Sequence, residues 1–141
     1  MEPGVEFYTA LAKARGEVGK IVKKKVGQAG QQKYRYADLE AILDATEVPL
    51  AENGFLMWFL PGDYANGTFH MEYELIHLPT GQKLSRLASM PSDANPRAVG
   101  SAQTYLRKYT KLAVLDMVSE DDDGKAASQE TRQRTPMAET A

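Results

Sequence analysis

The stretch from residue 55 to residue 90 most constrains the fold, because turn sequences separate short apolar or alternating runs there. The runs are "FLMWFL", "TFHMEYELIHL" and "QKLSRLASM", and the separators are "PGDYANG" and "PTG". In the middle run Phe69, Met71, Tyr73 and Leu75 share one face, and polar residues occupy the other. Alternation of this kind predicts a three-stranded antiparallel meander with one buried and one solvated face.

Helical patterns precede this region. Apolar residues recur at three- and four-residue steps over about 5–25, which predicts a first amphipathic helix. The Gly- and Gln-rich sequence "VGQAGQQKYRYAD" is expected to be a connection. A second helix should open near Asp38, kink or split at Pro49, and end at Asn53 and Gly54.

A long helix is expected after the meander. Asn95 is a suitable N-cap and Pro96 a suitable first residue for a helix that runs to about Asp116. Its apolar side is expected to contain Ala102, Tyr105, Leu106, Tyr109, Leu112 and Ala113. We therefore expect the two tyrosines to favour core packing over base stacking, and we expect Arg107 and Lys111, on the opposite side, to be exposed. The predicted fold class is α+β: a three-stranded antiparallel β-meander packed by a long C-terminal helix and preceded by two helices.

The chain length and composition indicate one domain. Of the 141 residues, we assign 1–124 to this domain and expect 125–141, which has almost no bulky apolar residue, to be a disordered tail. There is no cysteine, the N-terminus does not resemble a secretory signal, and the longest apolar run is far shorter than the roughly 20 residues of a membrane helix. These features predict a cytoplasmic location.

No familiar catalytic motif is complete. Gly19 and the lysine after it lack the flanking residues of a phosphate-binding loop. His70 and His77 should point to opposite faces of one strand, so they cannot share a metal, and each is expected at the surface or at an edge. The segment "SEDDDG" (119–124) lacks the ligand spacing of an EF-hand, and a solvated acidic terminus is the simpler interpretation. We therefore expect no cofactor, no bound metal and no enzymatic activity.

The net charge of −2 conceals two basic regions. Residues 13–35 carry eight cations and one acid, and a second basic set consists of Arg107, Lys108 and Lys111. Basic surfaces of this kind are typical of nucleic-acid binding, although a solvated helix face also explains many lysine runs. The acids at 120–123 could repel DNA from the wrong surface, or could meet the basic first helix of a neighbouring subunit.

Several motifs occur in order along residues 5–124. They are "YADL" (36–39), "PLAENG" (49–54), "HLPTG" (77–81), "GSA" (100–102) with Thr104 and Tyr105, "RKY" (107–109) and "DDDG" (121–124). In this combination the chain closely resembles the ERF (essential recombination function) family of single-strand annealing proteins, which belong mostly to bacteriophages and prophages. Lys108 is a departure, because the family often has a second arginine there. Lysine keeps the charge but loses the planar fork that suits phosphate.

The resemblance implies an ATP-independent, non-enzymatic recombination protein in the cytoplasm of a bacterial host cell. Such a protein binds single-stranded DNA, anneals complementary strands and assembles into a homo-oligomeric ring or filament. A phage exonuclease or a host single-strand-binding protein could cooperate with it. The alternatives are a metal-dependent nuclease that uses the acids at 121–123, and a protein that only protects single strands.

Candidate DNA-binding residues follow from the needs of single-strand binding. Cations must track the phosphate backbone, and aromatic or planar groups must contact the bases. The candidates are Lys33, Arg35, Tyr36, Arg97, Ser101, Gln103, Thr104, Arg107, Lys108 and Lys111. Tyr36 could serve either the core or a base.

Overall fold

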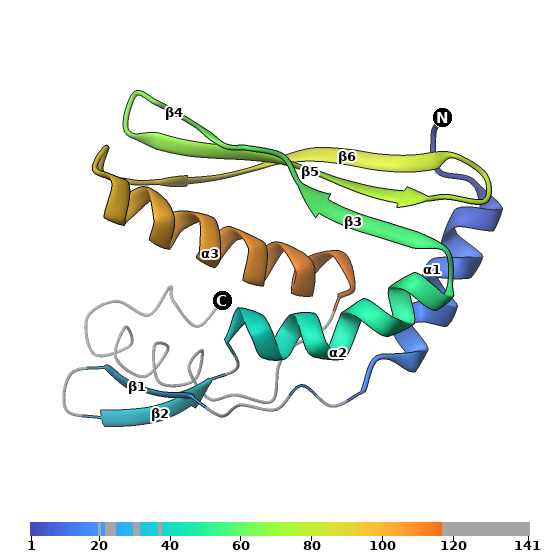
Figure 1. Ribbon diagram of the computed structural model, residues 1–141, viewed down its shortest axis with the longest axis horizontal. Helices are drawn as coiled ribbons and strands as arrows, with labels where there is room; N and C mark the ends of the chain where they lie inside the picture. Colours follow the sequence, from blue (N-terminus) through green and yellow to red (C-terminus); the bar gives the residue numbers. More distant parts are fainter. Residues whose placement is uncertain (20, 22–24, 30–31, 37, 117–141) are drawn as a thin grey trace, which may run out of the picture.

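The computed structural model describes residues 1–19, 21, 25–29, 32–36 and 38–116 (Figure 1). The helices are α1 (Val5–Glu17), α2 (Leu39–Glu52) and α3 (Pro96–Val114), and the strands are β1 (Lys25–Ala29), β2 (Gln32–Tyr36), β3 (Phe55–Phe59), β4 (Asp63–Ala65), β5 (Thr68–His77) and β6 (Gln82–Pro91). β1 and β2 form a separate hairpin, whereas the other strands form one antiparallel sheet. The predicted α+β class is confirmed, but the sheet has four strands where three were predicted.

The additional strand, β4, lies in the segment 61–67 that was predicted as a turn. β6 pairs with the whole of β5 on one side, and β3 and β4 pair with its two ends on the other side. The break between β3 and β4 includes Gly62, where an added Cβ would lie only 2.2 Å from Cζ of Phe69. β4 then turns into β5 through Asn66 and Gly67, whose φ angles of 53° and 79° suit a two-residue hairpin turn. The segment predicted as a turn therefore contains a short strand.

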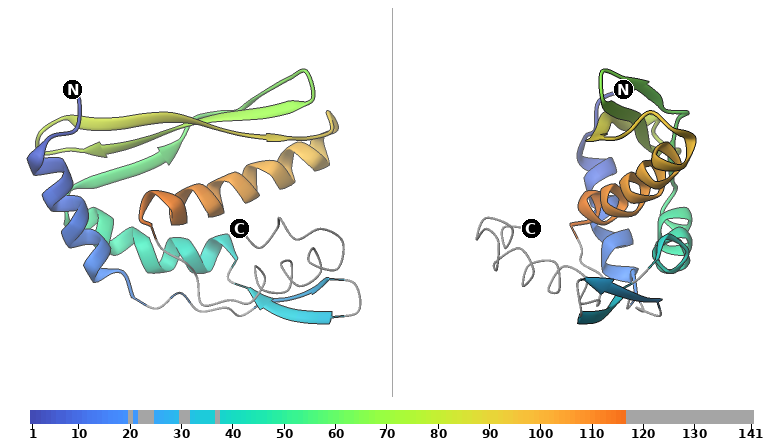
Figure 2. Two further views of the ribbon diagram at one scale, coloured as in Figure 1. Left: turned by 180° about the vertical axis from the view of Figure 1, so that it is seen from behind. Right: turned by 90° about the vertical axis from the view of Figure 1, so that its left-hand side faces the viewer.

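The helices lie on one side of the sheet (Figures 1 and 2). α3 runs along the sheet, α2 lies beyond α3, and α1 crosses one end of the molecule. Ala102 and Leu106 of α3 pack against Phe69 and Met71 of β5, the apolar face that the alternation predicts. Within the part of the chain that the structure describes, no helix covers the other face of the sheet.

α1 is tied to distant parts of the chain at both ends. Its first turn has no side-chain cap of its own, and Gln82 at the start of β6 supplies one. Gln82 Oε1 accepts hydrogen bonds from the main-chain N–H groups of Gly4 (2.8 Å) and Phe7 (3.2 Å). Near the other end, Arg15 Nε donates to the carbonyl oxygen of Leu115 at 2.7 Å. α1 is thus fixed both to the sheet and to the end of α3.

The segment "HLPTG" (77–81) forms the turn between β5 and β6. Gly81 donates its N–H to the carbonyl of His77 at 2.8 Å, and its φ of 73° favours glycine. His77 Nδ1 lies 2.7 Å from Thr80 Oγ1, and the His77 side chain is buried. The expectation of a surface or edge histidine is therefore wrong for His77, because the turn folds over it. His70 lies on the opposite, solvated face.

The first two helices differ from the predicted ones. α1 ends at Glu17 and not near residue 25, because Val18 already has an extended conformation. α2 continues through Pro49 without a break. Pro49 cannot donate to the carbonyl of Ala45, but only three helical residues follow it, so this loss affects the last turn alone. The predicted stop is confirmed: Asn53 is the C-cap, and Gly54 has a φ of 82°.

Two other predictions concern segments around the core. The sequence predicted as a connection before α2 contains the β1–β2 hairpin, with Gly27 opposite Tyr34. Its glycines and glutamines are poor strand formers, so composition gave no strand signal. The acidic residues 120–123 and the tail 125–141 lie outside the described residues.

Candidate nucleic-acid interface

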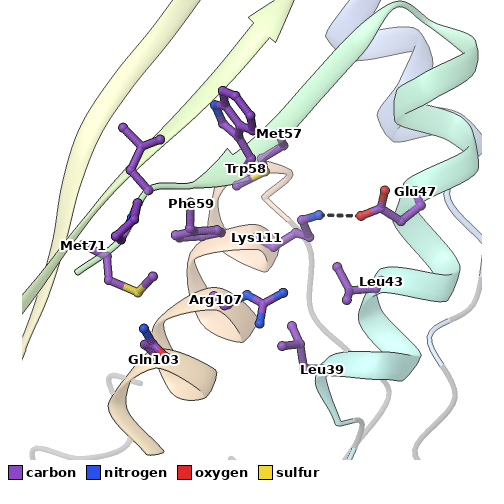
Figure 3. A pocket seen from close by; sticks show the side chains of 12 residues that line it. Leu39, Leu43, Glu47, Met57, Trp58, Phe59, Met71, Gln103, Arg107 and Lys111 are labelled. Carbon is purple, nitrogen blue, oxygen red and sulfur yellow. Dashed lines mark hydrogen bonds and ion pairs between the residues drawn. The ribbon is translucent and has the colours of Figure 1, made fainter. Parts of the chain in front are cut away.

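α3 has a hollow on each of two sides. The tyrosine groove, of about 770 Å³, lies between α3, the start of α2 and the β1–β2 hairpin. Its lining consists of Gly27, Asp38, Leu39, Arg97, Gly100, Ser101, Thr104, Tyr105, Lys108 and Tyr109. The methionine groove, of about 510 Å³, lies between α2, β3 and α3 (Figure 3). Leu39 lines both grooves and separates them.

The tyrosine groove takes its name from two exposed rings on α3. Tyr105 is 51% exposed and Tyr109 is 36% exposed. The expectation that they pack in the core is therefore wrong. The first half of α3 meets the sheet through Ala102 and Leu106, and the tyrosines lie to one side of that contact line. Both rings are available to a ligand in the groove.

The ring geometry limits how a base could bind. The centroids of Tyr105 and Tyr109 are 4.5 Å apart, and the planes are tilted by 48°. A base between two rings needs about 7 Å, twice the 3.4 Å stacking distance of nucleic acids. Lys108 Nζ also lies 4.8 Å from the centroid of Tyr109. The pair is thus a single platform on Tyr105, the more exposed ring, and not a slot that encloses a base.

Two lysines that the helical pattern places on the polar side of α3 are buried. Lys108 retains 7% exposure and Lys111 retains 3%, so the predicted exposure of Lys111 is wrong. Lys111 Nζ lies 3.2 Å from Glu47 Oε1 on α2. Long lysine stems can cover apolar surface, and α1 and α2 surround the second half of α3 as well as the sheet. Arg107 is exposed, as predicted.

The structure divides the predicted DNA-binding residues into three groups. Arg97, Ser101, Thr104 and Lys108 lie together in the tyrosine groove. Gln103, Arg107 and Lys111 line the methionine groove on the other side of α3. Lys33, Arg35 and Tyr36 are on β2, which pairs with the strand that contributes Gly27 to the tyrosine groove. Sequence reasoning missed the two tyrosines.

Local helix geometry positions the entrance of the tyrosine groove. Asn95 Oδ1 accepts from the N–H of Ala98 at 2.8 Å and so starts α3 at the predicted residue. Arg97 therefore lies in the first turn and is exposed. At Gly100 an added Cβ would meet no atom within 4 Å, so the helix surface there is open to a ligand. The one acid in the lining, Asp38, accepts from Ala41 N at 3.0 Å as the N-cap of α2.

The described residues contain no group of three or more His, Cys, Asp or Glu side chains that could hold a metal ion. Of the helices in the described ranges, none is long and apolar enough to cross a membrane.

The comparisons with known proteins give one match. The model of the family described as the ERF superfamily matches residues 7–141, which is nearly the whole chain. No curated protein and no solved structure matches the chain.

Proposed function

The chain belongs to the ERF superfamily, and on that premise we propose that it is a recombination protein that binds single-stranded DNA and anneals complementary strands without ATP. The tyrosine groove is the proposed binding site. The observation that supports it best is the exposed Tyr105 ring in the same groove as the exposed cationic side chain of Arg97. Cations along a groove together with an aromatic platform are the usual elements of single-strand binding.

The balance of these elements favours annealing over protection. Arg97 is exposed and can contact a phosphate, and Ser101 is exposed on the same side of α3. Among the described residues of this groove, the platform for a base is Tyr105, because the gap to Tyr109 is too narrow. A strand held mainly through its backbone keeps most of its base edges free. Those edges can then pair with a second strand.

Assembly into a homo-oligomer is part of the same proposal. The main-chain N–H of Lys83 points away from β5, because it donates to the carbonyl of Met1. Main-chain groups alternate in direction along a strand, so those of Ser85 and Leu87 also point away from β5. Beside this open edge Leu87 is 70% exposed and Tyr8 is 56% exposed. A neighbouring copy that covered this edge would pair the free backbone groups and bury the apolar side chains.

An annealing assay tests the proposed function. Two complementary labelled oligonucleotides are mixed with the protein in the absence of ATP, and the rate of duplex formation is measured. We expect faster pairing than without protein, and a clear loss of rate in Arg97→Ala. Arg86→Ala is the matched control, because Arg86 is exposed on β6 and lines neither groove.

Three results would contradict the proposal, and each has a different meaning. Slower pairing than without protein would indicate a protein that only protects single strands. Shortening of the labelled strands when magnesium is present would indicate a nuclease. Equal losses of rate in Arg97→Ala and Arg86→Ala would remove the tyrosine groove as the binding site.

A further inference from the structure

The methionine groove has the composition of a ligand pocket. Its volume of about 510 Å³ falls within the range of about 300–1,000 Å³ that is usual for small-molecule sites. One wall is apolar and includes Met57 and Phe59 of β3, whereas the Trp58 indole donates to Glu74 on the other face of the sheet (Figure 3). The polar side chains of Gln103 and Arg107 enter from α3. Mostly apolar pockets with a few placed polar groups are typical of binding sites.

The cations of this groove are only partly neutralised. The Lys111 side chain is 4% exposed, and its ammonium group has three N–H donors. Among the described residues, Glu47 Oε1 at 3.2 Å is the acceptor for that group. The Glu47 side chain is 61% exposed, so water already competes for its carboxylate. Arg107 lies one helical turn before Lys111 and faces the same groove.

We propose that the methionine groove binds a nucleoside monophosphate group. The planar base lies against Phe59, and the phosphate binds Arg107 and Lys111 in place of the Glu47 carboxylate. A phosphate has more acceptor oxygens than a carboxylate and forms strong charge-assisted hydrogen bonds with both cations. The amide of Gln103 can donate to the base edge and accept from it.

This site is distinct from the proposed strand-binding groove. Leu39 separates the two grooves, and no cation lines both of them. The nucleotide can be a free mononucleotide or the 5′-phosphorylated end of a DNA strand. Both ligands present the same base, sugar and terminal phosphate to the pocket.

Isothermal titration calorimetry provides a direct assay. The full chain is titrated with thymidine 5′-monophosphate, thymidine or inorganic phosphate, and the heat of binding is measured. We expect the monophosphate to bind at least about tenfold more tightly than either fragment, since each fragment lacks one half of the contacts. Arg107→Ala, at an exposed position, should weaken monophosphate binding by about tenfold.

The most discriminating variant is Glu47→Gln. If the carboxylate competes with the ligand phosphate, its removal should tighten monophosphate binding several-fold. A purely structural ion pair predicts no gain in affinity. Glu52→Gln is the matched control, because it removes the same charge from α2 at an exposed position outside the groove. The control should leave the affinity unchanged.

Two titrations with oligonucleotides distinguish a free mononucleotide from the 5′-phosphorylated end of a strand as the ligand. An oligonucleotide with a 5′-phosphate is compared with the same strand carrying a 5′-hydroxyl. Tighter binding of the phosphorylated strand assigns the groove to strand ends. Equal binding of the two strands assigns it to free mononucleotides, provided that the monophosphate itself binds.

Three results would overturn the inference. The first is that the monophosphate does not bind at millimolar concentration. The second is that monophosphate and thymidine bind with equal affinity. The third is that Arg107→Ala and Glu47→Gln both leave the affinity for the monophosphate unchanged. The Tyr105→Ala change in the other groove should leave monophosphate binding intact. The outcome is therefore independent of the annealing assay, and either proposal can fail alone.

Discussion

Replacement of Tyr105 by alanine should weaken single-strand binding by the energy of about one stacked base. The ring is 51% exposed, and its 4.5 Å separation from Tyr109 leaves no room for a base between the two. Among the described residues, the tyrosine groove therefore offers one stacking platform. Base–aromatic stacking contributes about 1–3 kcal/mol per base, so the affinity should fall by roughly 5- to 160-fold. The change removes no charge, and the salt dependence of binding should stay the same.

The assay is fluorescence anisotropy with a labelled homopolymer over a series of salt concentrations. Tyr105→Phe keeps the ring and should bind like the unmodified protein. Arg97→Ala should instead reduce the slope of log affinity against log salt by about 0.7, the value for one phosphate contact on a single strand. Two results would refute the reasoning: wild-type affinity in Tyr105→Ala, or an altered salt slope in Tyr105→Ala with a normal slope in Arg97→Ala.

Two further predictions concern stability. Gln82→Ala leaves the first turn of α1 without its acceptor and should lower the free energy of unfolding by about 1–3 kcal/mol in urea denaturation. Gln103→Ala, at an exposed position on α3, should change it little. The Trp58 indole N–H and then Lys83 lower the pKa of Glu74, with Trp58 Nε1 2.8 Å from Glu74 Oε1. The ionised Glu74 carboxylate therefore stabilises the folded protein. This stabilisation is present above the pKa that Glu74 has in the unfolded chain, and it is lost as the pH falls through the lower pKa of the folded protein. Trp58 fluorescence and stability should change below about pH 4.3, whereas a transition near neutral pH would contradict this assignment.

The sequence predicted those features that depend on local signals. Asn95 caps α3 at the predicted residue, and Gly54 follows the end of α2 as expected. The alternation around Phe69 and Met71 correctly identified the buried face of β5. These outcomes depend on the side chain and its few neighbours along the chain, so a pattern of three or four residues was sufficient.

The faces of α3 could not be predicted in the same way, because burial around this helix changes along its length. Its first half contacts the sheet through Ala102 and Leu106, which leaves Tyr105 exposed. In its second half, α1 and α2 also surround the helix, and Lys111 becomes buried against Glu47. A helical periodicity assumes one apolar side throughout. Such a periodicity predicts that Arg107 and Lys111 are both exposed, although Lys111 is buried and the structure divides the α3 candidates between two grooves.

α1 is synthesised before every other element, yet both of its ends depend on residues made much later. Gln82 follows its partners in α1 by 78 and 75 residues, and Leu115 follows Arg15 by 100. At about 5–20 residues per second, a ribosome needs roughly 4–20 s to supply these partners. A helix of 13 residues is marginal in water on its own. The newly made N-terminal segment therefore waits, with the side chain of Phe7 exposed, until β6 and α3 have been translated. Completion of the sheet and capping of α1 then occur together, once these residues have been made.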